Sequence, residues 1–503
     1  MYMKKEERGI YYMYKYDLRL KSILLALVMT GSYLLASCGS ESEGEETTVA
    51  SGNSSADETT AEVSAFDALP AEDYEGYVFK VMFNDTENFA MDIETAGEET
   101  GDIMNDTVYA RNLAVEEKFN IKIESTGDVN DNLLQTVKES VMAGDEPYDF
   151  YFSDCHAAAL APEGYFYELN SLPGLDLSNP WWDKAGIEGM SVGNKLYLMT
   201  GDISPSSLLT SSCMVFNKNL HDDAGIEYPY DMVRNGEWTI IKLAEITADL
   251  TLDLNGDGEY KLGDDVYGYS SWMCDSPFSL FYGAGGMLTT KGSDDIPVVD
   301  FDMDKISSIY EYMYRIIITN NSYFVTDLSL YETFAQCFND GGAYYCDITL
   351  AKIDRFLRDM DDDFGIIPIP KYDENQAEYL SCVNAAGGFQ YVPSNASNPE
   401  RTGRIVEALA AGAYDSVTPI IYEVITKTRN SRDEDSAEMV DLIVKNRVFD
   451  PYYVNLITGY GFMQDALVAK SESIVSRLES YRTSGAAAME KIVEAYQTMD
   501  SAE

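Results

Sequence analysis

"YVFKVMF" (Tyr77–Phe83) opens the stretch that decides the fold, and "YDFYFSD" (Tyr148–Asp154) closes it. Between them lies "NIKIES" (Asn120–Ser125). All three segments have the apolar, β-branched and aromatic character of strands. The stretches that separate them carry apolar residues at helical spacing. These are Met104, Val108, Val115 and Phe119, then Leu134, Val137 and Val141. Strand, helix, strand, helix and strand in this order predict a parallel sheet covered by helices.

The same alternation continues after residue 210. Strands are predicted at "CMVFN" (Cys213–Asn217), "VYGYSSW" (Val266–Trp272), Ala343–Asp347 and "FGIIPIP" (Phe364–Pro370). Helices are predicted at Ile240–Leu250, with Thr239 as N-cap, and at Ile306–Ile317. A chain of 503 residues has room for two such α/β domains.

The N-terminus has the features of an export signal. Lys15, Arg19 and Lys21 precede a short apolar run, which ends in "LASC" at Cys38. This order resembles the bacterial lipobox, in which the cysteine is lipidated and becomes the first mature residue. The alternative is an ordinary secretory signal with a chance cysteine, and translation can start at Met1 or at Met13. We expect residues 1–37 to be removed and the acidic, Ser- and Thr-rich residues 38–73 to form a disordered tether.

Composition excludes several functions. The net charge of −51, with 86 acidic against 35 basic residues, repels phosphate backbones, so we expect no nucleic-acid partner. Two histidines give little support to a zinc site or a Ser-His-Asp triad. The six cysteines after Cys38 have no metal-site spacing. Cys337 and Cys346 can pair, or all six can be buried thiols.

Several segments together resemble the bacterial extracellular solute-binding lipoproteins of sugar-type ABC importers. Besides the lipobox and "YDFYFSD", they are "NPWWDKAGIEGMSVGNKLYLMTGDIS", "MVFNKNL", "GEWT", "GGAYYCD", "FGIIPIPKYDE" and "VPSNASNPERTG". The resemblance implies a type II periplasmic-binding-protein-like α/β fold. Each of its two lobes has a mostly parallel sheet flanked by helices, and crossing segments form the hinge. We expect lobe 1 at residues 74–210 plus 376–430 and lobe 2 at residues 211–375 plus 431–503.

The resemblance also implies a ligand cleft at the carboxyl ends of strands, which parallel sheets favour. The residues expected there are Asp85, Ser153, Asp154, Trp272, Asp347 and Thr349. Aromatic rings cover the apolar faces of sugars, and carboxylates accept from their hydroxyls, so Trp272 is the candidate for stacking. The competing interpretation makes Asp154 or Asp347 a helix cap and Trp272 a core residue.

A loop reading "DLNGDGEYKLGDD" (Asp253–Asp265) resembles a calcium-binding loop. The expected oxygen ligands are Asp253, Asn255, Asp257, the Glu259 carbonyl and Asp264, and Gly258 allows a sharp turn. A sensor needs paired loops and paired helices, whereas a strand is predicted after Asp265. We therefore expect structural Ca²⁺, and the alternative is a solvated turn without metal.

These features predict a binding protein and not an enzyme. It would be lipid-anchored at Cys38 on the outer face of the cell membrane and monomeric. It would deliver a carbohydrate, or another polar solute, to ABC transporter permease subunits. Two alternatives remain: a secreted glycoside hydrolase with paired carboxylates, and a calcium-dependent surface docking module.

Overall fold

The computed structural model describes residues 63–85, 94–384, 386–426, 434–457 and 461–499. The predicted signal peptide (residues 1–37), the lipidation site Cys38 and the tether up to residue 62 lie outside the described residues. Within the described residues, no helix is both long enough and apolar enough to cross a membrane.

The end of the predicted tether (residues 38–73) is folded. Helix α2 (Ala65–Ala68) begins there, and the Asp415 carboxylate accepts the backbone N–H groups of Ala65 (3.2 Å) and Phe66 (2.8 Å). The Lys118 ammonium lies 4.5 Å from the centre of the Phe66 ring. These partners come from distant parts of the sequence, so local composition did not reveal that the tether ends before residue 73.

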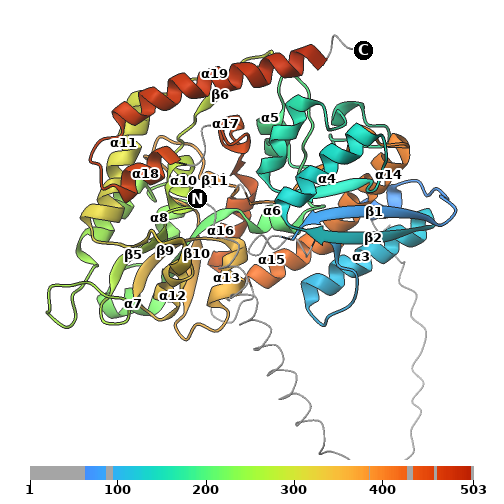
Figure 1. Cartoon of the computed structure of the whole chain (residues 1–503). Coiled ribbons are helices and arrows are strands. Elements are labelled where there is room, and N and C mark those ends of the chain that lie inside the picture. Colours follow the sequence, from blue (N-terminus) through green and yellow to red (C-terminus); the bar gives the residue numbers. More distant parts are fainter. Residues whose placement is uncertain (1–62, 86–93, 385, 427–433, 458–460, 500–503) are drawn as a thin grey trace, which may run out of the picture. The chain divides into compact units, whose positions relative to one another are not determined.

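The first sheet has the strand order β12-β3-β1-β2. β1 pairs in parallel with β2 and with β3, and β12 runs antiparallel to β3. The bounds are β1 (Tyr77–Asn84), β2 (Ile121–Asp128), β3 (Phe150–Ser153) and β12 (Phe389–Tyr391). The expected strand–helix–strand–helix–strand unit is confirmed, with α3 (Ile103–Phe119) and α4 (Asn130–Ala143) as its helices. We call this sheet and the elements packed on it the β1 lobe (Figure 1).

Helix α3 shows how local sequence sets these elements. The Asp102 carboxylate caps its first turn by accepting from Met104 N and Asn105 N. Val108, Val115 and Phe119 are fully buried or nearly so against the core. The helix ends at Asn120, whose φ of 46° places it in the left-handed conformation that terminates many helices.

The second sheet has the strand order β10-β4-β9-β5-β8. β4 runs antiparallel to β10 and β9, while β9, β5 and β8 are parallel. The bounds are β4 (Ser212–Asn217), β5 (Tyr267–Trp272), β8 (Tyr323–Val325), β9 (Ala343–Thr349) and β10 (Phe364–Ile367). In each sheet one strand is therefore reversed, β12 in the first and β4 in the second. We call the second sheet and its helices the β9 lobe.

Seven helices accompany the second sheet. They are α7 (Lys218–Ala224), α8 (Tyr230–Arg234), α9 (Ile240–Ile246), α10 (Ser276–Gly283), α11 (Met303–Tyr314), α12 (Thr333–Asn339) and α13 (Leu350–Leu357). The helix expected at 240–250 ends at Ile246, and a 3₁₀ turn, η4 (Thr247–Asp249), follows. The helix expected at 306–317 begins at Met303 and continues as the π-helix η5 (Arg315–Thr319).

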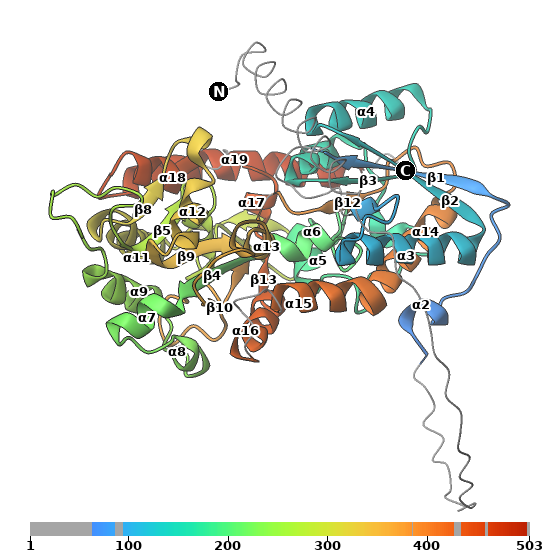
Figure 2. The ribbon, with the colours of Figure 1, turned by 90° about the horizontal axis from the view of Figure 1, so that it is seen from below.

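Three parts of the chain connect the two lobes. The first contains α6 (Pro205–Leu209), and the second runs from β11 (Ser381–Cys382) to β12. The third contains α14 (Pro399–Gly412), η7 (Ala413–Val417), α15 (Thr418–Thr426), α16 (Glu434–Lys445) and β13 (Arg447–Val448). α14 packs on α3 and α16 packs on β10, so these helices pass from one lobe to the other (Figure 2). The residue boundaries expected for the two lobes stay a prediction.

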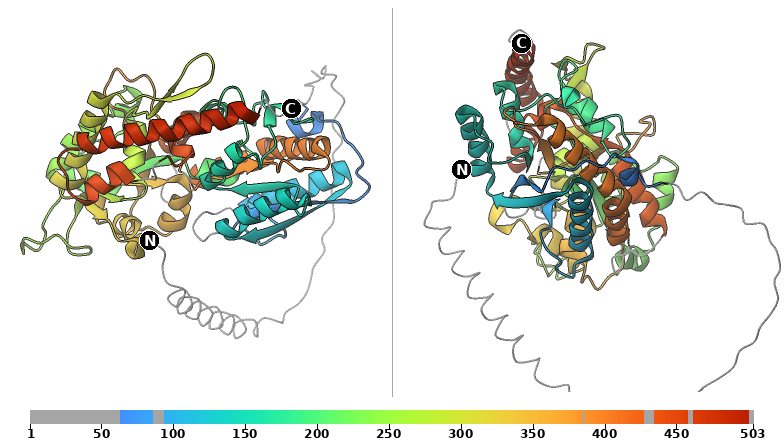
Figure 3. Two further views of the ribbon diagram at one scale, coloured as in Figure 1. Left: turned by 45° about the horizontal axis from the view of Figure 1, so that its top comes forward. Right: turned by 90° about the vertical axis from the view of Figure 1, so that its right-hand side faces the viewer.

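The C-terminal part of the chain contains α17 (Pro451–Val454), α18 (Gly461–Val468) and α19 (Val475–Met499). α19 contacts α11, α18 and β7 (Pro297–Val299) on the side of the β9 lobe. It also contacts η2 (Cys155–Glu163), which follows β3 in the β1 lobe. Figures 1 and 3 show this helix lying along elements of both lobes.

Among the described residues, none of the six cysteines expected in the mature chain forms a disulfide. Cys274 is partly exposed and the other five are buried. Cys337 and Cys346 are therefore not bonded to one another, and both belong to an apolar cluster that contains Phe334 and Phe338 and extends to Val108 of α3.

Candidate functional site

Asp154 and Ser153 lie at the carboxyl end of β3, as expected, and both are buried. The Asp154 carboxylate caps η2 by accepting the backbone N–H of His156 at 2.9 Å. His156 Nδ1 lies 2.9 Å from the same oxygen, and Asn84 Nδ2 lies 3.4 Å from the other. Asp154 thus has the structural role of a helix cap, and its part in ligand binding stays a prediction.

Asp85 and Thr349 also lie at strand ends, but they differ in exposure. Asp85 follows β1, is exposed, and its backbone N–H donates to the Asp128 carbonyl at 2.7 Å. Thr349 ends β9, is 3% exposed, and stands at the N-cap position of α13 without a side-chain capping bond.

Asp347 is a buried carboxyl in the middle of the second sheet. It lies on β9, is 1% exposed, and accepts a hydrogen bond from the Tyr269 hydroxyl through Oδ2 at 3.2 Å. Its Oδ1 makes no hydrogen bond of normal geometry within the described residues, but the Ser279 hydroxyl is close enough to favour the charged form and to oppose the rise in pKa. Burial disfavours the charged form and raises the pKa of Asp347 to about 7. Perturbed carboxyls of this kind are common at functional sites.

Trp272 ends β5, as expected, but side chains of this protein already pack on its ring. The Phe334 ring is nearly parallel to it, with centroids 6.3 Å apart, and the Tyr331 ring lies at 5.2 Å. The Lys352 ammonium lies 5.2 Å from the ring centre. The indole Nε1 is buried and has no partner within the described residues, so this N–H is a donor that a ligand can use.

A three-residue polar bridge beside Trp272 was not predicted as a site. Asp275 precedes α10, forms an ion pair with Lys352 on α13, and accepts from Asn384 Nδ2 at 2.7 Å. The backbone N–H of Asn384 donates to the Thr210 carbonyl at 3.1 Å. Two connecting segments and the β9 lobe therefore meet here. The position of Asp275 three residues after Trp272 was the available sequence signal.

Glu94 forms a second buried carboxyl site, at the start of α6. Its Oε1 accepts from the Ser204 hydroxyl at 2.7 Å and from Ser206 N at 3.1 Å, and it also contacts the Ser206 hydroxyl. Burial raises the pKa of Glu94 to about 7, although these hydrogen bonds and the Arg111 charge oppose the shift. Gly388 packs so closely here that an added Cβ would overlap the two serine hydroxyls.

Glu94 was not predicted, because its sequence context, "MDIETAG", contains no motif. Its partners lie more than one hundred residues away, so only the fold brings them together.

Each of the two buried carboxyls has one oxygen without a hydrogen-bond partner within the described residues, and five other side chains of the β9 lobe, β12 and the segment after α6 each have one such polar atom; we call these seven atoms the polar tract. Five of its residues lie on β5, α10, β9 and β12, while Glu94 precedes α3 and Ser211 follows α6. The seven atoms are Glu94 Oε2, Ser211 Oγ, Ser271 Oγ, Trp272 Nε1, Ser279 Oγ, Asp347 Oδ1 and Gln390 Oε1. Native proteins leave few buried polar atoms unpaired, so each of these atoms is a group that a bound polar molecule could satisfy. Other such atoms lie elsewhere in the described residues, on Tyr379 and Arg401 for example.

The loop expected to bind calcium joins η4 to β5, as predicted. Asp253 accepts from Gly256 N (2.6 Å) and Gly258 N (2.8 Å), and Asp257 accepts from Glu259 N (2.8 Å). The Lys261 ammonium forms ion pairs with Asp257 and Glu259. In this arrangement the loop's own donors satisfy its acidic groups.

Asp265, which was not among the expected ligands, is turned into the loop and accepts from Leu254 N and Lys261 N. Asp264 is exposed. Within the described residues, no group of three or more His, Cys, Asp or Glu side chains is arranged to hold a metal ion. The oxygen donors of Asp253, Asn255 and Asp257 are of the type that calcium prefers, and calcium binding by this loop stays a prediction.

Neither a family model nor a curated protein matches this sequence. Solved structures do match. M. tuberculosis UspC is 13% identical with a TM-score of 0.55, over 82% of this chain and 100% of that protein. The cyclic alpha-maltosyl-1,6-maltose binding protein of Arthrobacter globiformis is 13% identical with a TM-score of 0.55, over 83% and 100%.

A third match is the ABC substrate-binding protein Lmo0181 of Listeria monocytogenes in complex with cycloalternan. It is 12% identical with a TM-score of 0.51, over 83% of this chain and 100% of that protein. At such identities the similarity shows the fold alone. The expected fold class, a two-sheet α/β fold of the periplasmic-binding-protein type, is therefore confirmed.

Proposed function

We propose that this protein is an extracellular substrate-binding protein that captures a carbohydrate and delivers it to the permease of an ABC importer. The observation that supports this most is the polar tract, the set of buried polar atoms without partners that includes Glu94 Oε2 and Asp347 Oδ1. A sugar has many hydroxyl donors, and the tract contains three acceptor oxygens from Glu94, Asp347 and Gln390. Solved proteins of the same fold were crystallised with cyclic and linear oligosaccharides.

In this proposal, the ligand lies between the β1 and β9 lobes, against α6. Asp347 and Glu94 accept its hydroxyls, and the Trp272 indole N–H donates to it. Asp154, Asp85, Ser153 and Thr349 stay candidate contacts at the strand ends. The Asp275–Lys352–Asn384 bridge holds the β9 lobe against the connecting segment and shapes the site.

A thermal-shift screen of the purified protein with maltotetraose, mannotriose and cycloalternan tests the proposal. A ligand at about 100 times its Kd stabilises the folded state by roughly 2.7 kcal/mol. The Asn384→Ala variant serves as the matched comparison, because it breaks the bridge at Asp275 and should weaken the shift. No stabilisation by any carbohydrate of a wider panel would contradict the proposal, and product release would favour a hydrolase.

Two further parts of the proposal concern the chain outside the site. Lipidation of Cys38 would anchor the protein at the outer face of the cell membrane, with the acidic residues after it as a spacer. Calcium bound at Asp253, Asn255 and Asp257 would stiffen the β9 lobe at the entry to β5 without taking part in ligand binding.

A further inference from the structure

A β-hairpin of the β9 lobe reaches across to the β1 lobe. It consists of β6 (Thr289–Lys291) and β7 (Pro297–Val299), which pair antiparallel, and it lies between α10 and α11 in the sequence. Asp450, which is fully buried, holds its base by accepting from Leu288 N (2.7 Å) and the Thr289 hydroxyl (2.6 Å). The hairpin is therefore anchored at its base and extends from there.

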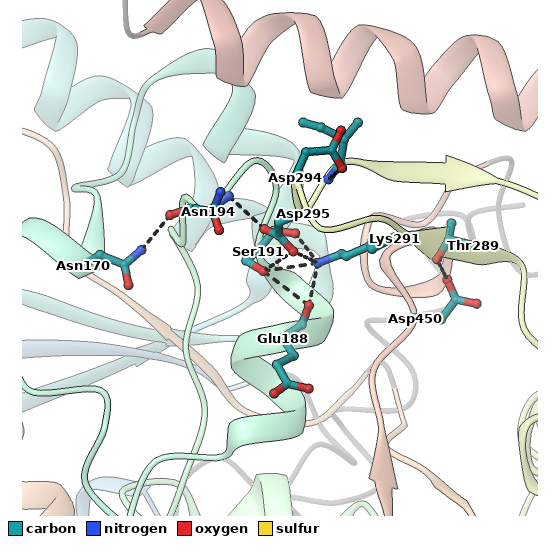
Figure 4. A network of polar contacts seen from close by, with 10 residues as sticks. Asn170, Glu188, Ser191, Asn194, Thr289, Lys291, Asp294, Asp295 and Asp450 are labelled. Carbon is teal, nitrogen blue, oxygen red and sulfur yellow. Dashed lines mark hydrogen bonds and ion pairs between the residues drawn. The ribbon is translucent and has the colours of Figure 1, made fainter.

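The far part of the hairpin binds the end of helix α5 (Lys184–Met190). The Lys291 ammonium donates to the backbone carbonyls of Glu188 and Ser191, each at 2.5 Å, and to the Ser191 hydroxyl at 3.2 Å (Figure 4). The last carbonyls of a helix lack partners within the helix and carry partial negative charge, so they attract a cation. Lys291 thus caps α5 from another lobe.

Asp295, at the turn of the hairpin, completes the contact. Its carboxylate accepts from the Ser191 hydroxyl (3.0 Å) and from Asn194 N (2.8 Å), and its carbonyl accepts from Gly193 N (2.9 Å). It also pairs with Lys291 at 3.1 Å. The two charged side chains are only 16% and 19% exposed, so solvent and salt screen this pair less than a surface pair.

Helix α5 and the turn that follows it belong to the β1 lobe. The Asp183 backbone N–H at the start of α5 donates to the Thr200 carbonyl, and Met199 pairs with Gln390 of β12. Leu196, just after the turn, accepts from Leu169 N. The contacts of Lys291 and Asp295 therefore join one lobe to the other.

The end of α19 adds a second contact on the same side. The Tyr496 ring packs edge to face on Tyr197 with centroids 5.0 Å apart, and Lys195 donates to the Tyr496 carbonyl at 3.4 Å. Tyr496 is 4% exposed, and α19 also packs on β7. Hairpin, α19 and the turn at residues 192–195 thus form one joint, which we call the clasp.

We infer that the clasp keeps the two lobes joined at this side. When the lobes move relative to one another, they rotate about the clasp and do not separate at it. Among the connecting segments, β13 also reaches α5, because Arg447 forms an ion pair with Asp183 at 2.7 Å. The clasp adds to this contact at the other end of α5, through Lys291 and Asp295. Separation at the clasp would expose two mostly buried charges and the last carbonyls of α5 at the same time. The joint therefore restricts which lobe motions are available, whatever the ligand.

Hydrogen exchange of the full-length protein tests this inference. In Lys291→Met we expect the amides of Gly193 and Asn194, which donate to Asp295, to exchange about tenfold faster or more, together with those of the hairpin. Lys242→Met is the matched control, because Lys242 makes only an exposed ion pair with Glu245. Small-angle scattering of the same proteins should show a larger radius of gyration for Lys291→Met than for the control.

If Lys291→Met fails to fold, the milder Asp295→Asn variant can be measured in its place. It should show the same increases in exchange rate and in radius of gyration, but smaller ones. Faster exchange confined to residues 289–299, with residues 192–195 unchanged, would mean that the hairpin does not hold the β1 lobe. Unchanged scattering in both variants would likewise overturn the inference.

Discussion

Replacing Asp347 with Asn should make the stability of the protein less dependent on pH. Burial raises the pKa of Asp347 from an ordinary value of 3.8 to about 7 in the folded state. Stability from the protonated carboxyl is therefore fully present below the unfolded-state pKa and is lost as the pH rises through about 7. At 1.36 kcal/mol per pKa unit, titration of this one group lowers the free energy of unfolding by roughly 2.5 kcal/mol between pH 5 and pH 8.

The assay is urea unfolding of wild type and Asp347→Asn at both pH values. The wild type should lose roughly 2.5 kcal/mol more than the variant between pH 5 and pH 8. Glu94 titrates in both proteins, so its contribution cancels in the comparison. Asp300→Asn, at an exposed position, is the control and should behave as wild type. If Asp347→Asn and wild type show the same pH dependence, burial does not hold this carboxyl in the protonated form.

Three other predictions follow from the sequence and the site. Cys38→Ala should move the protein from the membrane fraction to the soluble fraction, and persistence in the membrane fraction would contradict lipidation. Chelation should lower the melting temperature of calcium-dialysed protein with little change in sugar affinity, and an unchanged melting curve would leave the Asp253–Asp265 loop as a plain turn. Ala variants of Trp272 and Asp154, titrated by calorimetry, should each lose about 1.5–3 kcal/mol of binding if they contact the ligand; unchanged affinity would assign them to packing and capping.

Much of the fold was predictable, because it depends on local patterns. The strands at Tyr77, Asn120 and Tyr148 were visible as apolar segments, and the helices between them had regular spacing. The sequence did not reveal that β12 and β4 are the reversed strands of the two sheets. A strand's direction depends on which strands it pairs with, and those come from distant parts of the chain. Likewise, the folded structure at the end of the predicted tether depends on Asp415, whose carboxylate accepts from the backbone of Ala65 and Phe66 more than three hundred residues away.

The candidate site was predictable only in part, for a similar reason. Strand ends can be read from sequence, and this reading placed Asp347 and Trp272 in the polar tract. It also selected Asp154, whose carboxylate caps η2 by accepting from His156 N. Glu94, Asn384 and Lys352 were missed, because their chemistry arises from partners on other elements. A single acid among 86 carries no local mark of burial.

The cost of the polar tract is itself an argument for binding. A buried polar group without a partner destabilises a protein by about 1–3 kcal/mol, and total stability is typically only about 5–15 kcal/mol. The polar tract contains several such atoms, with Glu94 Oε2 and Asp347 Oδ1 among them. Folding alone does not favour them, whereas a ligand rich in hydroxyls would satisfy them on binding. Glu94→Gln and Asp347→Asn should therefore raise the melting temperature at pH 8 and weaken carbohydrate binding together. If both variants are stabilised but bind carbohydrate with unchanged affinity, the polar tract does not contact the ligand.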